Sequence, residues 1–275
     1  TLGLVTAATL RLVPAIADSA VAWVGVDTPH AALALLRFLE NEIGPAVEGF
    51  EVIPDDMLNA VLRHIPGTRA PIATRAAWNI LVEIDLNTQE RSASSLLEQA
   101  LAAFFATGQA RDAVIAANKT QAEQFWRLRE SVSEAERARG PALQFDVSVP
   151  VHAMPDFMID IAASAEKAFP GTSAGSFGHL GDGNVHLHVR APTGTSDGAR
   201  WRDENAPNIS AFVHDVVTAR AGSISAEHGI GQMKRAEFGR LASPAQIGVL
   251  RAIKCALDPL GIMNPGKLIP LASVA

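Results

Sequence analysis

The sequence has 275 residues, of which 48% are hydrophobic, so it can bury a substantial core as one large domain or two small ones. A formal net charge of −6 gives no electrostatic attraction for nucleic acid or anionic lipid. The single cysteine excludes an intrachain disulfide, and no apolar run reaches the roughly 18–20 residues that cross a bilayer. We therefore expect a soluble globular protein of a reducing compartment, the cytoplasm.

The opening segment, Thr1–Pro14, is typical of a β-strand that is already under way, because aliphatic and β-branched residues dominate it. The chain also lacks an initiator methionine. We therefore expect a fragment that begins inside a strand.

Beyond Pro14 the apolar pattern alternates between the period of a strand and that of a helix. A strand over Ala20–Val26 leads to a helix that Thr28 caps, Pro29 opens and Ile43 ends. The pattern continues with strand Val47–Ile53, helix Asp55–His64, strand Trp78–Leu86, helix Arg91–Ala106 and strand Asp112–Ala116. This indicates an α+β fold of duplicated ferredoxin-like β-α-β units, with an antiparallel sheet and helices mainly on one face.

The second half begins with a long amphipathic helix over residues 119–139, which Gly140-Pro141 ends. The elements predicted after it are strand Leu143–Val149, helices Met154–Phe169, Asn205–Ala221 and Pro244–Leu257, a further helix that begins near Gln232, and a Gly/Pro-rich tail, Asp258–Pro270.

The segment GHLGDGNVHLHV, which starts at Gly178, holds three of the eight histidines. It predicts a glycine-rich turn that feeds a strand, in which Asn184, His186 and His188 share one face. His179 precedes the turn, and the glycines let the backbone fold back toward His186. Two converging imidazoles are good ligands for a first-row transition metal. A cluster of hydrogen-bonded surface histidines would have the same pattern.

A second string, SAEHGIG, places Glu227 and His228 side by side between small residues. Glu227 can supply a third, anionic ligand, while His228 reaches another part of the same cavity as a base. Two histidines and one carboxylate leave coordination positions open for a substrate, as a catalytic site requires. The alternative is a capping role for this string before the helix near Gln232.

The strings GHLGDGNVHLHV and AEHGIG, with the ending NPGK at Asn264, resemble the C-terminal domain of FAD-linked oxidases of the vanillyl-alcohol oxidase superfamily. The likeness is greatest to its D-lactate, D-2-hydroxyglutarate and glycolate dehydrogenases, and it spans essentially the whole chain. It implies that residues 1–14 are the last strand of an FAD-binding domain that is otherwise missing. Residues 15–257 would form the substrate- and metal-binding cap domain, and residues 258–275 would return to the flavin.

The resemblance implies a flavin-dependent dehydrogenase that oxidises a D-2-hydroxyacid to a 2-oxoacid. His179, His186 and Glu227 would bind a divalent metal, usually zinc, and His228 would be the general base. The metal would polarise the hydroxyl as hydride leaves for the flavin. The electron acceptor is not indicated, and a homodimer is compatible with the family.

The same resemblance implies three contacts with FAD and two with the substrate. Arg129, in the string WRLRE, would grip a substrate carboxylate, and Ser133 lies one helical turn further along. Gly3, Val5 and Asn264 would lie against FAD, most of which the missing domain would hold.

Two positions depart from the pattern of the dicarboxylate-oxidising relatives. Gln144 stands where they have a lysine, and His188 stands where they have an asparagine. Loss of the cation weakens the case for a second substrate carboxylate. Gln144 can still bind a neutral or singly charged tail, and His188 can assist binding, so the sequence does not favour 2-hydroxyglutarate.

Two other functions fit the same residues. A metal-dependent hydrolase would use a His/His/Glu site to activate water, although the sequence has no HExxH helix. A non-catalytic metal-binding module is the second alternative for the isolated chain, since it contains no recognisable pyrophosphate-binding loop.

Overall fold

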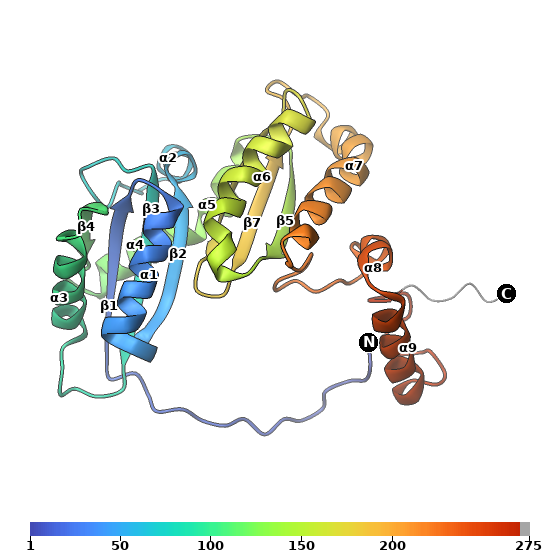
Figure 1. Ribbon diagram of the computed structural model, residues 1–275, viewed down its shortest axis with the longest axis horizontal. Coiled ribbons are helices and arrows are strands. Elements are labelled where there is room, and N and C mark those ends of the chain that lie inside the picture. The colour runs from blue at the N-terminus through green and yellow to red at the C-terminus, as the bar shows by residue number, and fades with distance from the viewer. Residues whose placement is uncertain (270–275) are drawn as a thin grey trace.

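The structure, a computed structural model, describes residues 1–269 (Figure 1). Its centre is a seven-stranded antiparallel sheet in the order β4-β1-β3-β2-β6-β7-β5. The strands are β1 Asp18–Val26, β2 Val47–Pro54, β3 Trp78–Leu86, β4 Ala110–Ile115, β5 Ala142–Ser148, β6 Ser173–His179 and β7 Asn184–Arg190. The helices are α1 Pro29–Ile43, α2 Asp55–His64, α3 Ala93–Phe105, α4 Lys119–Glu130, α5 Val132–Ala138, α6 Met154–Ala168, α7 Gly198–Ala219, α8 Arg235–Leu241 and α9 Pro244–Leu257. The predicted α+β class is confirmed.

The sheet consists of two ferredoxin-like units joined edge to edge. The first unit has four strands in the order β4-β1-β3-β2, with α1 and α3 as its crossovers. The second unit repeats this with β5, β6 and β7, and residues 1–269 form no fourth strand beside β5. At that place a single antiparallel bridge joins Ser148 to Ser223. The predicted duplication is therefore present, with one strand of the second unit reduced to a bridge.

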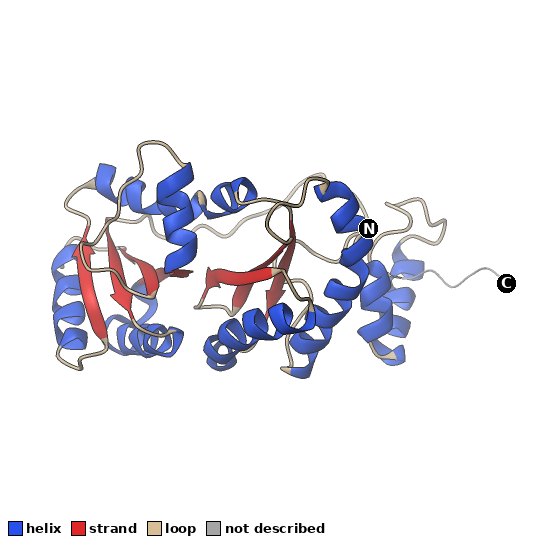
Figure 2. Cartoon of the chain, turned by 90° about the horizontal axis from the view of Figure 1, so that it is seen from above, coloured by secondary structure: helices blue, strands red, loops and turns tan. Residues whose placement is uncertain are grey.

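Helices lie on both sides of the sheet (Figure 2). The larger layer, α1, α3, α6 and α7, covers one face and packs on alternate residues such as Ala22 and Val24. The intervening residues, such as Val21 and Trp23, face the opposite side, where α2, α4 and α5 cover them. The period-two alternation of each strand produces these two apolar layers.

The second unit presents polar side chains on the face that carries α2, α4 and α5. In β7, Val185 and Leu187 enter the larger core, so His186 and His188 point to the opposite face. In β5, Phe145 and Val147 enter the core in the same way, which turns Asp146 to the face of the histidines. The predicted sharing of one face by the histidines is confirmed.

Several predicted elements differ in the structure. Thr1–Pro14 is not a strand, because it pairs with no strand among the described residues and its apolar side chains are exposed. The helix over residues 119–139 is divided at Ser131 into α4 and α5. The helix expected from Asn205 begins earlier, at Gly198, because Asp197 caps it. The helix expected near Gln232 begins at Arg235.

One strand, β6, has no counterpart among the predicted elements. Its sequence, SAGSFGH, is rich in small residues that have low strand propensity. It forms because β2 and β7 pair with it on its two sides. Within residues 1–269, no helix combines the length and the apolar character that a membrane crossing requires.

Candidate metal and substrate site

The candidate site lies where β6 ends and β7 begins, on the polar face of the second unit. His179 is the last residue of β6, and His186 is the third residue of β7. Gly183, in the turn between them, has φ +77°, and a Cβ there would lie 2.0 Å from the carbonyl oxygen of Val149. This position therefore requires glycine, and the turn it permits brings the two histidines together.

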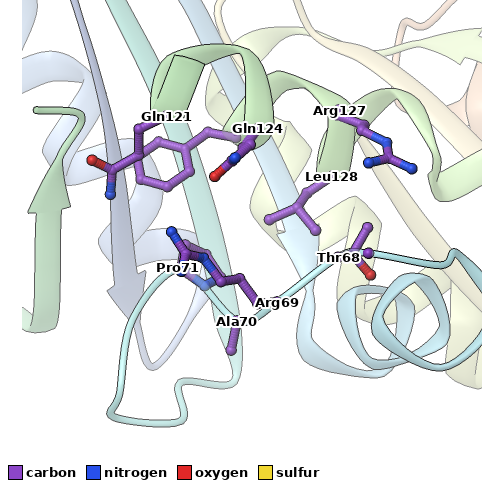
Figure 3. Close-up of a pocket in the computed structure, with 10 residues that line it drawn as sticks. Thr68, Arg69, Ala70, Pro71, Gln121, Gln124, Arg127 and Leu128 are labelled. Atoms are coloured by element: carbon purple, nitrogen blue, oxygen red, sulfur yellow. The ribbon is translucent and has the colours of Figure 1, made fainter. Parts of the chain in front are cut away.

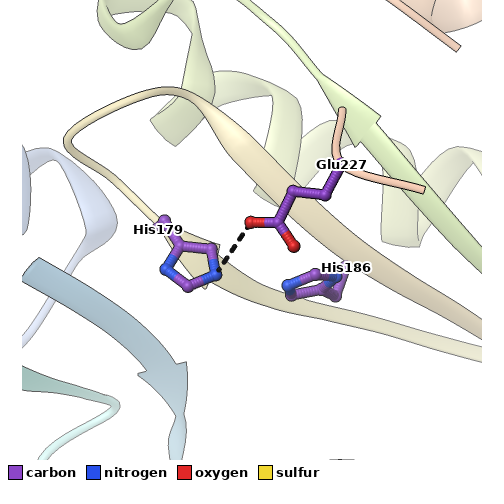
Figure 4. A group of neighbouring side chains, drawn as sticks. All are labelled: His179, His186 and Glu227. Atoms are coloured by element: carbon purple, nitrogen blue, oxygen red, sulfur yellow. Dashed lines mark ion pairs between the residues drawn. The ribbon is translucent and has the colours of Figure 1, made fainter. Parts of the chain in front are cut away.

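Three side chains converge as the sequence predicts (Figure 4). One ligand atom from each of His179, His186 and Glu227 lies within 4.8 Å of the other two. The Nε2 atom of His179 is 3.6 Å from the nearer carboxylate oxygen of Glu227. Two imidazole nitrogens and one carboxylate are a donor set that zinc and related divalent metals accept, with positions left for further ligands. The residues present therefore fit a divalent metal.

Glu227 reaches the histidines because its segment follows the edge of β5. Ser148 and Ser223 exchange backbone hydrogen bonds of 2.9 and 2.8 Å, which is the bridge in place of a fourth strand. Further along, the backbone N–H groups of Glu227 and His228 donate to the buried carboxylate of Asp146 at 2.9 and 2.8 Å. Asp146 therefore holds the Glu-His pair over the sheet.

The surroundings favour an ionised Asp146 and a neutral His186. Burial alone would raise the pKa of Asp146, but the two backbone N–H groups lower it. Burial, and then the charges of Arg129 and His179, lower the pKa of His186 to about 4. The second carboxylate oxygen of Asp146 is buried without a hydrogen-bond partner among the described residues, 4.0 Å from Nδ1 of His186. A neutral imidazole is the form that binds a metal.

Glu51 also belongs to the site, although sequence reasoning missed it. The carboxylate of Glu51 accepts a hydrogen bond from Nε of Arg129 at 2.7 Å and lies 2.7 Å from Nδ1 of His179. Burial alone would raise the pKa of Glu51, but His179 and Arg129 lower it. The hydrogen bond to Glu51 in turn raises the pKa of His179. The signal in the sequence was a lone carboxylate inside the apolar strand Phe50–Ile53.

The structure brings Arg129 and His228 to the site. Arg129 is buried, stacks on the ring of Phe177 at 4.8 Å and places Nη2 3.4 Å from Nε2 of His179. The imidazole of His228 is 70% exposed, with Nδ1 3.7 Å from Asp146. The ring is thus open to solvent above the sheet.

The other predicted substrate contacts differ in their exposure and in the element that carries them. Gln144 is exposed on β5, two residues from Asp146, and Ser133 is half-buried on α5. His188 is 3% exposed, and its Nδ1 lies 3.5 Å from Glu136, which also binds Arg190. His188 therefore lies against the buried ion pair of Glu136 and Arg190, opposite Gln144 and two residues along β7 from His186.

Comparison with known proteins identifies the family. A model of the FAD linked oxidases, C-terminal domain, matches residues 16–268. The chain belongs to this family. It is 31% identical over 269 residues to the mitochondrial D-2-hydroxyglutarate dehydrogenase of Arabidopsis thaliana, covering 98% of this chain and 46% of the relative. It is 34% identical over 273 residues to the D-2-hydroxyglutarate dehydrogenase of Xanthomonas citri, covering 98% and 55%. The chain thus spans about half the length of these relatives.

Solved structures support the fold of this FAD-linked oxidase C-terminal domain. A substrate-bound p-cresol methylhydroxylase superposes with a TM-score of 0.61 at 15% identity, over 92% of this chain and 53% of the other. A 4-ethylphenol oxidase from Gulosibacter chungangensis superposes with a TM-score of 0.58 at 13% identity, over 94% and 55%. At these identities the likeness concerns the fold.

The residues predicted to contact the flavin in this FAD-linked oxidase domain lie in the first segment and in the C-terminal tail, far in sequence from the proposed metal ligands. Gly3 and Val5 are exposed in the extended first segment, and Asn264 is exposed in the tail after α9. Nζ of Lys254, on α9, donates to the carbonyl oxygens of Thr1 and Met263. The first segment and the tail therefore meet beside α9 (Figure 1). Residues 270–275, the end of the predicted tail, lie outside the described residues.

Among the hollows of the surface that α4 lines, two differ in their relation to the candidate site. A pocket of about 220 Å³ between loop 67–71 and the outer side of α4 contains none of the predicted site residues (Figure 3). A groove of about 430 Å³ includes His179 and Glu51, together with the acidic residues Glu40, Glu48 and Asp182. The groove, and not the pocket, adjoins the candidate site.

Proposed function

We propose that the chain is the C-terminal portion of an FAD-dependent dehydrogenase that oxidises a D-2-hydroxyacid to a 2-oxoacid. The observation that supports this best is the convergence of His179, His186 and Glu227 beside Arg129 and His228. Family membership and the names of the relatives support the reaction class. The flavin is assigned mainly to a domain outside this chain.

The domain assignment is part of the proposal. Residues 1–14 would complete the FAD-binding domain, residues 15–257 would form the substrate- and metal-binding domain, and residues 258–275 would return to the flavin. The meeting of Thr1 and Met263 at Lys254 supports a shared position for the first segment and the tail. An extended, unpaired segment such as Thr1–Pro14 would find its hydrogen-bond partners in the neighbouring domain, where it would become a strand.

Two bound groups supply chemistry that side chains cannot. A divalent metal, which we propose to be zinc held by His179, His186 and Glu227, would polarise the hydroxyl and carboxylate of a 2-hydroxyacid. FAD would supply the hydride acceptor. The low pKa of His186 supports its role as a neutral ligand.

The residues of the chain bind the substrate and move one proton. His228, whose ring is exposed, would accept the proton of the substrate hydroxyl on a ring nitrogen. The Nδ1 atom of His228 lies 3.7 Å from the carboxylate of Asp146, which can orient the ring. Arg129 uses Nε for Glu51, so its terminal N–H groups are available for the substrate carboxylate.

A substrate with a neutral or small tail is our proposal for the finer specificity. The relatives carry the name D-2-hydroxyglutarate dehydrogenase, but Gln144 offers no positive charge to a second carboxylate. His188 is buried against Glu136, so it too is poorly placed to bind a distal carboxylate. Ser133 remains a proposed contact on the strength of its place one turn beyond Arg129.

The reaction is tested by joining this chain to the part of the Xanthomonas citri relative that it does not match, which we propose to hold FAD. Anaerobic addition of D-lactate or D-2-hydroxyglutarate should bleach the flavin absorbance, and L-lactate should not. His228→Asn should slow the bleaching by at least about a hundredfold. His64→Asn, an exposed histidine on α2, is the matched control. No bleaching with any 2-hydroxyacid, together with zinc-dependent ester hydrolysis, would instead support a hydrolase.

The cytoplasmic location is a proposal that rests on the single cysteine. The Arabidopsis relative is named as mitochondrial, whereas the name of the Xanthomonas relative gives no compartment. A homodimer is also part of the proposal, and a measurement of molecular mass in solution tests it.

A further inference from the structure

Glu51 is a buried carboxylate on an otherwise apolar strand. Its neighbours Phe50 and Val52 enter the larger core, and Glu51 points to the opposite face with a side chain that is 3% exposed. A carboxylate buried this deeply is costly unless charged or hydrogen-bonding groups compensate it. Both of its oxygens are used, one for Nε of Arg129 and one for Nδ1 of His179, each at 2.7 Å.

The contact with His179 selects one ring nitrogen for the candidate metal. With Nδ1 directed at the Glu51 carboxylate, the proton of a neutral ring resides on Nδ1. Nε2 then carries the lone pair and faces Glu227 at 3.6 Å. A carboxylate behind the ring also makes the ligating nitrogen more basic.

The contact with Arg129 fixes the direction of the guanidinium. Nε is held by Glu51, and Cζ lies over the ring of Phe177, 4.8 Å from its centroid, so Nη2 is directed to the site near Nε2 of His179. A lysine, with a single nitrogen, could not bind Glu51 and a substrate carboxylate in this forked way.

Glu51 also lies at the junction of the two ferredoxin-like units. Among the described residues, β2 and β6 pair at two register positions, Glu51 with His179 and Val52 with Gly178. The N–H of Leu180 also donates to the carbonyl oxygen of Phe50. Arg129 comes from α4, which packs on the first unit, whereas His179 belongs to the second. One carboxylate thus joins a group from each side.

We propose that Glu51 is a positioning residue of the site, which sets the ligand nitrogen of His179 and the orientation of Arg129 together. It does not touch the reacting atoms itself. This inference rests on the proposed metal site and deepens it. It also predicts that metal binding depends on the docking of the two units at β2 and β6.

The test is zinc binding by the chain, measured by calorimetric titration with zinc alone for three variants. Glu51→Gln should raise the dissociation constant about 10- to 100-fold, because an amide cannot accept from both donors. Glu51→Asp should lose nearly as much, because a shorter carboxylate cannot span the same two groups. Glu98→Gln removes the same charge from an exposed position on α3, away from the site, and should bind like the wild type.

Each outcome decides the matter. Unchanged zinc binding in Glu51→Gln, or full binding in Glu51→Asp, overturns positioning, since a purely electrostatic role would survive the shorter carboxylate. A wild type that binds no zinc removes the metal site and this inference with it. If His186→Ala abolishes zinc binding while Glu51→Gln retains it, the metal site stands and only the inference on Glu51 is overturned.

A second measurement does not depend on the folding of any Glu51 variant. In the zinc-loaded wild type, long-range ¹H–¹⁵N spectra of the histidine rings report which nitrogen carries the proton. His179, assigned by the signals lost in His179→Ala, should carry it on Nδ1. Zinc on Nδ1, with the proton on Nε2, would overturn the proposal.

Discussion

The carboxylate of Asp146 accepts the backbone N–H of His228 at 2.8 Å, and the same oxygen accepts that of Glu227 at 2.9 Å. Lys234, further along this segment, donates to the backbone carbonyl of Asp146 at 3.0 Å. Together these contacts hold at the edge of β5 a segment that in the first unit would be a fourth strand. The candidate ligand Glu227 and the candidate base His228 therefore share one anchor.

Removal of this anchor should loosen both residues together. We expect Asp146→Ala to weaken zinc binding about 10- to 100-fold, as loss of a supporting hydrogen bond does at metal sites. Asp146→Asn keeps one acceptor and should have a smaller effect. Asp203→Ala, an exposed aspartate of α7, is the control. Equal zinc affinity in Asp146→Ala and wild type would contradict the role of Asp146.

The buried Glu136 should make the free energy of unfolding depend on pH. Its side chain is 1% exposed, binds Arg190 and accepts from Arg139 at 2.8 Å. Burial alone would raise its pKa, but His188 and the two arginines lower it from 4.5 to about 2. Because the folded-state pKa lies below the unfolded one, the stabilisation is complete above pH 4.5 and is lost as the pH falls toward 2.

The size of this effect is on the order of 3 kcal/mol, from about 1.4 kcal/mol for each pKa unit. Urea unfolding of wild type and Glu136→Gln between pH 7 and 2.5 measures it. The wild type should be the more stable at pH 7, and the difference should shrink below pH 4.5. A difference that stays constant over this range would contradict the assigned cause.

Gln144 should control the preference for a second carboxylate. In the protein joined to an FAD-binding domain, Gln144→Lys should raise the kcat/KM ratio of D-2-hydroxyglutarate over D-lactate by about tenfold, since hydrogen bonds to charged groups contribute about 1.5–3 kcal/mol. Gln124→Lys adds the same charge on the outer side of α4 and is the control.

Other side chains near Gln144 carry the positive charge that a second carboxylate would need. Arg137 and Arg202 line the same open groove as Gln144. If the wild type already prefers D-2-hydroxyglutarate strongly and Gln144→Lys adds nothing, then Gln144 is not the residue that decides specificity.

Local pattern was enough to predict the parts of the site that depend on neighbouring residues. The period of a strand places His186 and His188 on one face, and the glycines around Asp182 predict the turn that returns the chain to His179. The apolar alternation in β5 likewise predicts the side on which Asp146 lies. These features require no knowledge of the rest of the fold.

The supporting contacts could not be predicted because they depend on strand register between distant segments. Glu51 meets His179 across the β2–β6 pairing, and Asp146 meets His228 at the edge of β5, where the segment after Ser223 takes the place of a fourth strand. The small residues of β6 give no strand signal of their own. The long helix is divided at Ser131, where no glycine or proline in the sequence indicates a break.

The measurement that tests the central claim most directly is the metal content of the purified chain, by elemental analysis. Wild type is compared with His179→Ala, His186→Ala and Glu227→Ala, with His64→Ala as an exposed control. We predict close to one divalent metal ion per wild-type and control chain, and its loss in each of the three variants. A wild type without metal after supplementation, or metal retained in all three variants, would contradict the site.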